Sequence, residues 1–276
     1  MQRIDAHQHF WKFDPVRDSW ITEEMKAIQR DFLPEHLLPV LQQNGFDGCV
    51  LVESEQAEAH NNFLLELAAQ NDFIKGIVGW VDLKAPDVKD RLAHYRQFDK
   101  IKGFRHVLQS ETDRAMMLQP EFMRGIAALK EFDFTYDVLI FTDQLKYLPE
   151  FFAAFPDQKF VIDHIAKPGI KTGEIEGWKE AMIKLAEFSN VYCKVSGMVT
   201  EANWYNWKME DFIPYLDVVS EAFGPDRILY GSDWPVCLVA GSYEKMLGIV
   251  QEYFSSFTAA QQQAFFGGNA VQFYNL

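Results

Sequence analysis

Two histidines near the start of the chain and one aspartate near its end have the side chains best suited to chemistry. His7 and His9 close a short apolar run, and Asp233 stands in Tyr230-Gly231-Ser232-Asp233-Trp234-Pro235. Side chains two residues apart on a strand share one face, so His7 and His9 should point at a common spot. Paired imidazoles suit metal binding or proton transfer, and a carboxylate at a strand end suits ligation or base catalysis. The structural alternative for Asp233 is to cap a helix.

The other five histidines divide by position. His106 and His164 fall at the ends of predicted strands, where a satisfied core histidine is the alternative to a functional one. The remaining three fall on predicted helices or loops, and we expect them at the surface: His36, His60 and His94.

Three charged residues on predicted strands are further candidates. Arg105 has a planar fork that suits an oxyanion or a substrate oxygen, with a structural ion pair as the alternative. Glu53 ends the second predicted strand and suits substrate hydroxyls, a metal, or a capping role. Lys194 on the seventh is placed like a Schiff-base lysine, although a buried or ion-paired lysine is the simpler interpretation.

Tryptophans gather just after predicted strand ends. Flat rings at that position can stack on a sugar-like ring and form the wall of a pocket, or they can seal the top of a barrel. The five residues concerned are Trp11, Trp80, Trp204, Trp207 and Trp234.

The elements that must position these residues alternate along the chain. Apolar runs predict strands over 4–10, 48–53, 74–81, 101–108, 134–140, 159–165, 191–197 and 227–232. Helical periodicity lies between them, most clearly over 34–44, 61–71, 120–132, 176–188 and 210–223. Eight strands that alternate with helices predict a (β/α)8 TIM barrel forming one domain over residues 1–276. The long connections 11–31 and 198–208 follow strand carboxyl ends, where such barrels carry their active sites.

Composition narrows the class of protein. The chain has 276 residues, 48% of them hydrophobic, and a formal net charge of −14, so a nucleic-acid partner is not expected. We find no run long enough for a membrane span and no signal-like segment, which predicts a cytoplasmic protein. An odd number of cysteines in apolar stretches predicts buried free thiols: Cys49, Cys193 and Cys237.

Four ordered motifs resemble the amidohydrolase superfamily, specifically its amidohydrolase-related branch, which includes sugar-acid lactonases. They are Asp5-Ala6-His7-Gln8-His9-Phe10-Trp11, Gly103-Phe104-Arg105-His106, Asp163-His164-Ile165-Ala166-Lys167-Pro168 and Tyr230-Gly231-Ser232-Asp233-Trp234-Pro235. The resemblance covers nearly the whole chain and implies a distorted barrel that hydrolyses a small sugar-derived lactone, in carbohydrate catabolism. It also implies that Asp233 takes a proton from the attacking water and that His164 orients the water or stabilises the anionic intermediate.

The metal content stays open at this point. His7, His9 and Asp233 offer three ligands for one divalent ion such as zinc, and without an ion the same histidines would donate hydrogen bonds to the substrate carbonyl. Arg105 and His106 stand where the superfamily places a bridging residue, and Asp137 stands where many members have a histidine, so a two-metal centre is not expected.

Three alternative functions are compatible with the same residues. A metal-dependent decarboxylase of the same superfamily, a non-catalytic small-molecule-binding barrel and, more remotely, an aldolase centred on Lys194 are the other readings of the chain. A homodimer is left open. Candidate substrate-contacting residues are Glu53, Trp80, His106, Trp11, Trp234 and Lys194.

Overall fold

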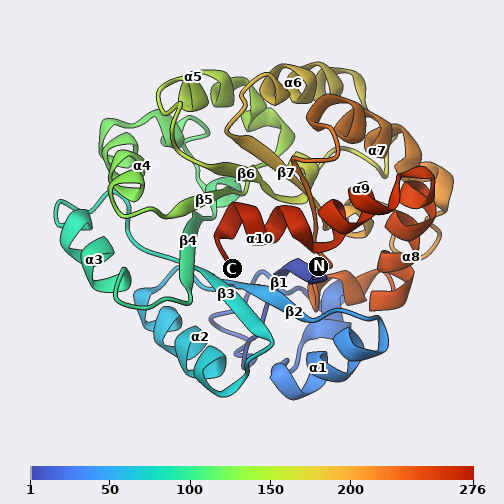
Figure 1. Cartoon of the computed structure of the whole chain (residues 1–276), viewed down its shortest axis with the longest axis horizontal. Helices are drawn as coiled ribbons and strands as arrows, with labels where there is room; N and C mark the ends of the chain where they lie inside the picture. The colour runs from blue at the N-terminus through green and yellow to red at the C-terminus, as the bar shows by residue number, and fades with distance from the viewer. Residues whose placement is uncertain (1) are drawn as a thin grey trace.

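The computed structural model describes residues 2–276, whose centre is a barrel of eight parallel strands in sequential order (Figure 1). The predicted (β/α)8 barrel is therefore confirmed. Its strands are shorter than the apolar runs from which they were predicted. Backbone bonds from His9 N–H to the Trp234 carbonyl (2.7 Å) and from Asp233 N–H to the His7 carbonyl (2.8 Å) join the last strand to the first. The strands are β1 Ile4–Gln8, β2 Gly48–Val52, β3 Ile74–Gly79, β4 Ile101–His106, β5 Thr135–Val138, β6 Phe160–Ile162, β7 Val191–Val195 and β8 Ile228–Tyr230.

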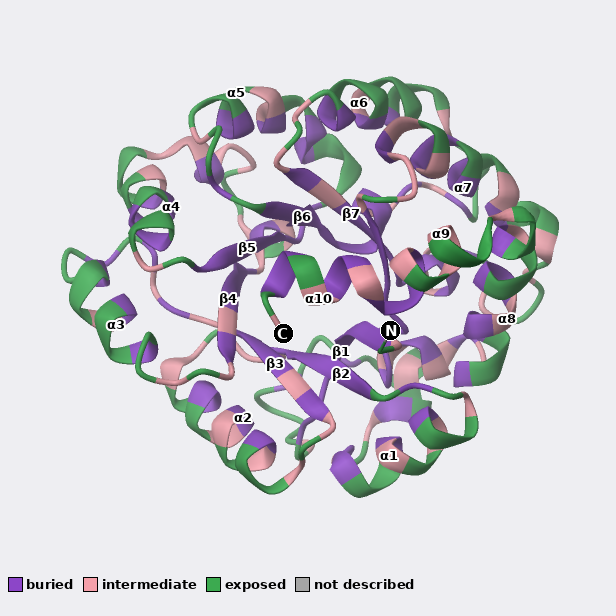
Figure 2. Ribbon diagram, in the orientation of Figure 1, coloured by how far each residue is buried: buried purple, intermediate pink, exposed green. Residues whose placement is uncertain are grey.

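A ring of helices surrounds the barrel, and most of them have one buried and one exposed side (Figure 2). In α4, for example, Phe122, Ile126 and Leu129 recur at helical spacing and are fully buried. The five predicted helices form, and the structure adds others that were not predicted individually. The helices are α1 Pro34–Gln43, α2 Glu58–Gln70, α3 Val88–Tyr95, α4 Pro120–Glu131, α5 Leu148–Ala153, α6 Glu176–Ala186, α7 Met209–Phe223, α8 Tyr243–Tyr253, α9 Ala259–Gln263 and α10 Asn269–Tyr274.

The short helix α10 covers the amino-terminal end of the barrel, where both chain termini lie (Figure 1). Its Phe273 and Tyr274 pack with inward-facing β-branched and leucine side chains of the strands, such as Val50, Val161 and Leu229. These residues fill the lower barrel with an apolar plug. The upper barrel is left for polar side chains at the carboxyl ends of the strands.

A bulge in β1 decides which of its side chains enter the barrel. Asp5 pairs with Cys49 and Gln8 with Leu51, so β1 carries one residue more than β2 between these points. Without the extra residue, Asp5 and His7 would share a face. With it, Asp5 faces the outer helix α8, where it accepts a bond from Tyr243, and His7 faces the barrel interior.

Two expectations about the chain as a whole can be compared with the structure. The three cysteines are buried and free, as predicted. Among residues 2–276, no helix has the length and apolar character needed to cross a membrane.

We predict that Gly125→Ala destabilises the protein, because α4 packs directly on the chain after β3 at this position. A Cβ on Gly125 would lie 2.1 Å from the backbone oxygen of Leu83, so the helix must shift, at a cost of about 1–3 kcal/mol. Thermal denaturation would measure the loss. Gly248→Ala is the matched control, since Gly248 lies within α8 with open space around it and alanine there should stabilise the helix by about 1 kcal/mol. Equal effects of the two substitutions would contradict the packing argument.

Candidate functional site

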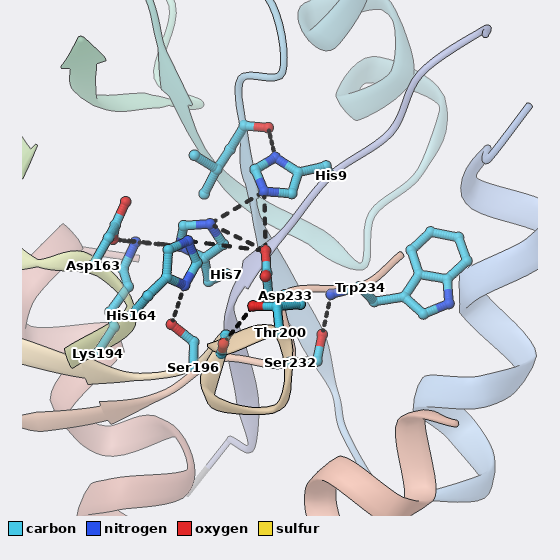
Figure 3. Close-up of polar contacts among 12 residues, drawn as sticks. His7, His9, Asp163, His164, Lys194, Ser196, Thr200, Ser232, Asp233 and Trp234 are labelled. Carbon is cyan, nitrogen blue, oxygen red and sulfur yellow. Dashed lines mark hydrogen bonds and ion pairs between the residues drawn. The ribbon is translucent and has the colours of Figure 1, made fainter. Parts of the chain in front are cut away.

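Four side chains from distant parts of the sequence converge at the carboxyl end of the barrel (Figure 3). The Asp233 Oδ1 atom lies 3.4 Å from His9 Nε2, 3.9 Å from His7 Nε2 and 4.0 Å from His164 Nε2. The two Nε2 atoms of His7 and His9 are 3.2 Å apart. The structure thus brings together the histidine pair and the aspartate that the sequence singled out.

Asp5 holds the two ends of this arrangement in register. Its Oδ1 accepts bonds from the Ser232 N–H (2.9 Å) and the His7 N–H (3.2 Å), and its Oδ2 accepts one from Tyr243 (3.1 Å). Burial raises the pKa of Asp5 to about 6. Asp5 therefore ties β1 to the segment that carries Asp233, whose own backbone lies in the left-handed region at φ 56°.

His164 is delivered by an unusual turn rather than by the end of a strand. The four residues from His164 to Lys167 all have left-handed backbone angles, φ 48° to 58°, where the sequence predicted a strand through Ile165. Each such residue costs about 1–2 kcal/mol, more for a β-branched one. Burial of Ile165 and a bond from Trp178 Nε1 to its carbonyl (2.7 Å) hold the turn in place. Backbone strain of this kind is characteristic of functional sites.

Gly197 makes room for the His164 ring. Its backbone has φ +62°, and a Cβ there would lie 2.6 Å from Nδ1 of His164. The neighbouring Ser196 Oγ is 2.9 Å from the same nitrogen. A side chain at Gly197 would displace the ring that this contact fixes.

The surroundings of the His7 and His164 imidazoles favour their neutral forms. Burial lowers the pKa of His7 and of His164 well below the usual range, and for His7 the Lys194 ammonium acts in the same direction. His9 Nδ1 lies 2.9 Å from the Val52 carbonyl, which can only accept, so His9 donates through Nδ1 and its Nε2 faces Asp233.

Below the cluster of His7, His9, His164 and Asp233 lies a layer of buried charged side chains. Arg105 donates through Nε to Glu53 Oε1 (2.8 Å) and through a terminal nitrogen to Asp163 Oδ2 (3.2 Å). The Lys194 ammonium bonds to Asp137 and lies 3.1 Å from Asp163 Oδ1. All five are buried, and Lys194, Asp137 and Asp163 are wholly so. The neighbouring cations hold the pKa of Asp163 well below its usual range despite its burial.

A cavity of about 320 Å³ opens above these residues. Six of the sequence candidates line it: His9, Trp11, Glu53, Arg105, His164 and Asp233. Sequence reasoning missed Trp20, Gln109 and Lys167, which also line the cavity. Trp20 lies in the long 11–31 connection, whose position after β1 was the available signal, but no residue pattern distinguished Trp20 within it.

Four residues predicted to contact substrate lie outside the cavity lining. His106 alternates with Arg105 along β4, so its ring faces Phe122 of α4. Trp80 donates to His106 Nδ1 (3.4 Å). Trp234 is buried against Phe32, and Lys194 lies below the cavity floor.

The tryptophan wall is correspondingly smaller than predicted. Trp204 and Trp207 border a separate surface groove and donate to backbone carbonyls of Thr200 and Ala240. Only Trp11 of the five predicted rings lines the cavity, and the others contribute to packing around the barrel top.

The donor set at the mouth fits one divalent ion. His7, His164 and Asp233 each offer one ligand atom, and these atoms lie within 4.8 Å of one another. Zinc binds such nitrogen and oxygen atoms at about 2.0–2.2 Å, so ligands around one ion lie about 3–4 Å apart. A second group, formed by His7, Asp137 and Asp163, surrounds the Lys194 ammonium and does not fit a second cation.

The fold and the mouth cluster together define a barrel enzyme whose site is built from a His-x-His pair, a histidine after β6 and an aspartate after β8. The sequence model of the Amidohydrolase family matches residues 4–276, and the chain belongs to this family.

Relatives match the chain over its full length. The L-fucono-1,5-lactonase of Burkholderia multivorans is 38% identical, with 99% of this chain and 96% of that protein covered. The L-fucono-1,5-lactonase of Burkholderia ambifaria is 36% identical over the same shares. A crystal structure of an amidohydrolase from Burkholderia multivorans with bound zinc superposes with a TM-score of 0.96, at 38% identity and with 100% of each chain covered.

The peripheral histidines were only partly predicted. His36 and His94 are exposed on α1 and α3, as expected. His60 on α2 is instead buried at 8% exposure, and its Nε2 accepts a bond from the Ser54 N–H (3.3 Å). Burial, with the nearby Arg17 guanidinium, lowers the pKa of His60 to about 4.

We predict that His60 makes the folded protein sensitive to acid. Unfolded His60 takes up a proton below about pH 6.5, whereas folded His60 does so only near pH 4, so its contribution is present above pH 6.5 and is lost as the pH falls toward 4. The free energy of unfolding should decrease by about 3 kcal/mol over this pH range. The stability difference between the native protein and His60→Gln should narrow by this amount between pH 7 and pH 4 in urea denaturation. A difference that stays constant with pH would contradict the assignment.

Proposed function

We propose that this protein is a lactonase that opens the ring of a sugar-derived aldonolactone, of the L-fuconolactone or L-rhamnonolactone kind, by attack of water on the ring carbonyl. Full-length similarity to two L-fucono-1,5-lactonases supports the reaction type. The polar floor and aromatic wall of the cavity support a small polyhydroxyl substrate.

The observation that carries this proposal is that the Asp233 carboxylate has no lysine or arginine partner within residues 2–276. Three carboxylates line the cavity. Glu53 pairs with Arg105, and Glu55 lies 3.6 Å from Arg17. Within residues 2–276, the ion-pair partners of Asp233 are all histidines. A carboxylate without a lysine or arginine partner is the one best able to accept a proton.

In the proposed reaction, Asp233 acts first as base and then as acid. It takes one proton from a water molecule while the water oxygen bonds to the carbonyl carbon. The carbonyl electrons move onto the carbonyl oxygen and return as the ring C–O bond breaks. Asp233 then gives its proton to the departing alkoxide, which leaves an open-chain hydroxy acid.

Other cavity residues would stabilise the oxyanion and hold the ring. Arg105 and His164 flank the floor beside Asp233, where donors can stabilise developing negative charge. The Glu53 Oε2 atom is buried and has no hydrogen-bond partner among residues 2–276, so a substrate hydroxyl would satisfy it. Trp11 and Trp20 provide flat apolar surface for the ring.

Charge pairing in the cavity favours an uncharged lactone over an acidic one. Arg105 is paired with Glu53 and Asp163, Arg17 pairs with Asp18 (2.7 Å), and Lys167 lies 3.3 Å from Glu201. These cations are therefore already neutralised. A substrate carboxylate would have to compete with the protein's own carboxylates, whereas hydroxyl groups would not.

A single divalent ion has a place in this proposal. His7, His164 and Asp233 would hold it, with His9 Nε2 beside them. When bound there, a zinc ion supplies Lewis acidity and lowers the pKa of a water molecule toward ~7. The zinc-bound relative supports the presence of a metal ion.

We predict that Asp233→Asn lowers kcat for an aldonolactone by about 10²–10⁴-fold, because the amide cannot accept the water proton. Acid release from a panel of five- and six-membered aldonolactones, followed by a pH indicator with and without chelator, would measure it. Asp226→Asn, at an exposed turn before β8, is the matched control and should leave the rate unchanged. Full activity of Asp233→Asn would remove the proposed base. Release of CO₂ from an aromatic acid, with no lactone opened, would indicate a decarboxylase instead.

We predict that the protein binds one equivalent of Zn²⁺ at the mouth, not two, because the Lys194 ammonium lies within the second acidic group. Metal analysis after equilibrium dialysis would give the stoichiometry. His164→Asn should weaken binding by at least about 10-fold, since it removes a ligand. His94→Asn on exposed α3 should match the native protein. Two tightly bound equivalents would contradict the role assigned to Lys194.

A further inference from the structure

We propose that Tyr274, in helix α10 at the closed end of the barrel, is a positioning residue for His7 at the open end. The hydroxyl of Tyr274 donates to the Asp137 carboxylate, at 3.0 Å from Oδ1 and 2.9 Å from Oδ2. Asp137 in turn holds the Lys194 ammonium, which lies 3.1 Å from His7 Nδ1. The kinetic consequence of this arrangement rests on the proposed lactonase activity, but the structural consequence does not.

Each contact in the series from Tyr274 through Asp137 and Lys194 to His7 is buried, so no water molecule can replace a lost partner. Tyr274 is 2% exposed, and Asp137, Lys194 and His7 are 0% exposed. An unpaired polar atom at such depth costs about 1–3 kcal/mol, so the groups are held strongly to their partners. The orientation of one group therefore constrains the next.

Lys194 is the link that most needs positioning. Its ammonium sits on a flexible four-carbon stem and has three N–H donors. The ammonium donates to Asp137 Oδ2 and lies 3.1 Å from both Asp163 Oδ1 and His7 Nδ1. The place of the ammonium is thus fixed by these three neighbours, and Tyr274 is the group that keeps the Asp137 carboxylate turned toward it.

His7 transmits the arrangement to the mouth of the barrel. Its Nδ1 lies between Lys194 and Asp163, whereas its Nε2 lies 3.2 Å from His9 Nε2. The imidazole is rigid, so a shift of the groups at Nδ1 reorients Nε2 beside Asp233. Lys194 and Tyr274 do not line the cavity, so the effect should fall on kcat rather than on substrate binding.

Tyr274→Phe tests the proposal because it removes one hydroxyl and keeps the ring, including its face 5.5 Å from the Lys194 Nζ atom. Tyr136→Phe is the matched control. Tyr136 is a buried tyrosine adjacent to Asp137 on β5, and its hydroxyl has no hydrogen-bond partner within residues 2–276. The two variants therefore lose the same atom from similar surroundings, but only one loses a contact in the chain.

The first measurement is the ¹⁵N NMR spectrum of the histidine rings, with the His7 signals assigned by His7→Asn. We expect Tyr274→Phe to shift the His7 ring nitrogens and Tyr136→Phe to leave them in place. The second measurement is lactone hydrolysis, for which we expect a decrease in kcat of about 10-fold or more in Tyr274→Phe, with KM within about twofold of native.

Unchanged His7 signals in Tyr274→Phe, or the same shift in both variants, would overturn the proposal. A rise in KM with kcat unchanged would overturn it as well, since that pattern indicates a disturbed cavity. If the native protein opens no lactone, the proposed function fails, and the NMR comparison still decides whether Tyr274 positions His7.

Discussion

The structure depends on five charged side chains that are buried together within the barrel. Two cations, Lys194 and Arg105, face three carboxylates, Asp137, Asp163 and Glu53, and water reaches almost none of them. Burial of any one of these charges alone would cost several kcal/mol, so the group is stable only as a complete set. Its completeness has a functional consequence. Because Lys194 already supplies positive charge between Asp137 and Asp163, the residues above it are left to form a site for a single ion or for none.

Regular and irregular backbone are divided between the two ends of the barrel. The lower half is built from alternating apolar side chains and closed by α10, and it needs little beyond strand geometry. The mouth depends on departures from that geometry: the bulge between Asp5 and Gln8, the left-handed turn from His164 to Lys167, and the left-handed Asp233. Each departure directs a side chain toward the cluster around Asp233. The rigid lower half provides the packing that holds these strained residues in place.

The division also explains what the sequence could predict. Local patterns are visible in the sequence: eight apolar runs, their alternation with helices, and the spacing of His7 and His9. These patterns predicted the barrel and the convergence of the histidine pair with Asp233. The bulge, the turn at Ile165 and the contacts of Trp80, His106 and Lys194 depend on residues far away in the chain. No local pattern shows that a lysine is surrounded by Asp137, Asp163 and His7, or that the final helix returns to the barrel with Tyr274. For His106, strand alternation offers a local signal: if Arg105 faces the barrel interior, the next residue is predicted to face the surrounding helices.

The same burial acts oppositely on the two kinds of titratable group around the mouth. It lowers the pKa of His7 and His164, so these imidazoles stay neutral, whereas it raises the pKa of a buried carboxyl group such as Asp5. The Arg105 guanidinium and the Lys194 ammonium form ion pairs with nearby carboxylates. Asp233 has no such partner, because the Lys194 ammonium lies deeper in the barrel and the cations near the cavity entrance, Arg17 and Lys167, pair with other carboxylates. At the point where substrate can reach it, Asp233 therefore has only histidines as ion-pair partners within residues 2–276. If the Lys194 ammonium lay at the carboxyl end of the barrel instead, Asp233 would be engaged in an ion pair with it.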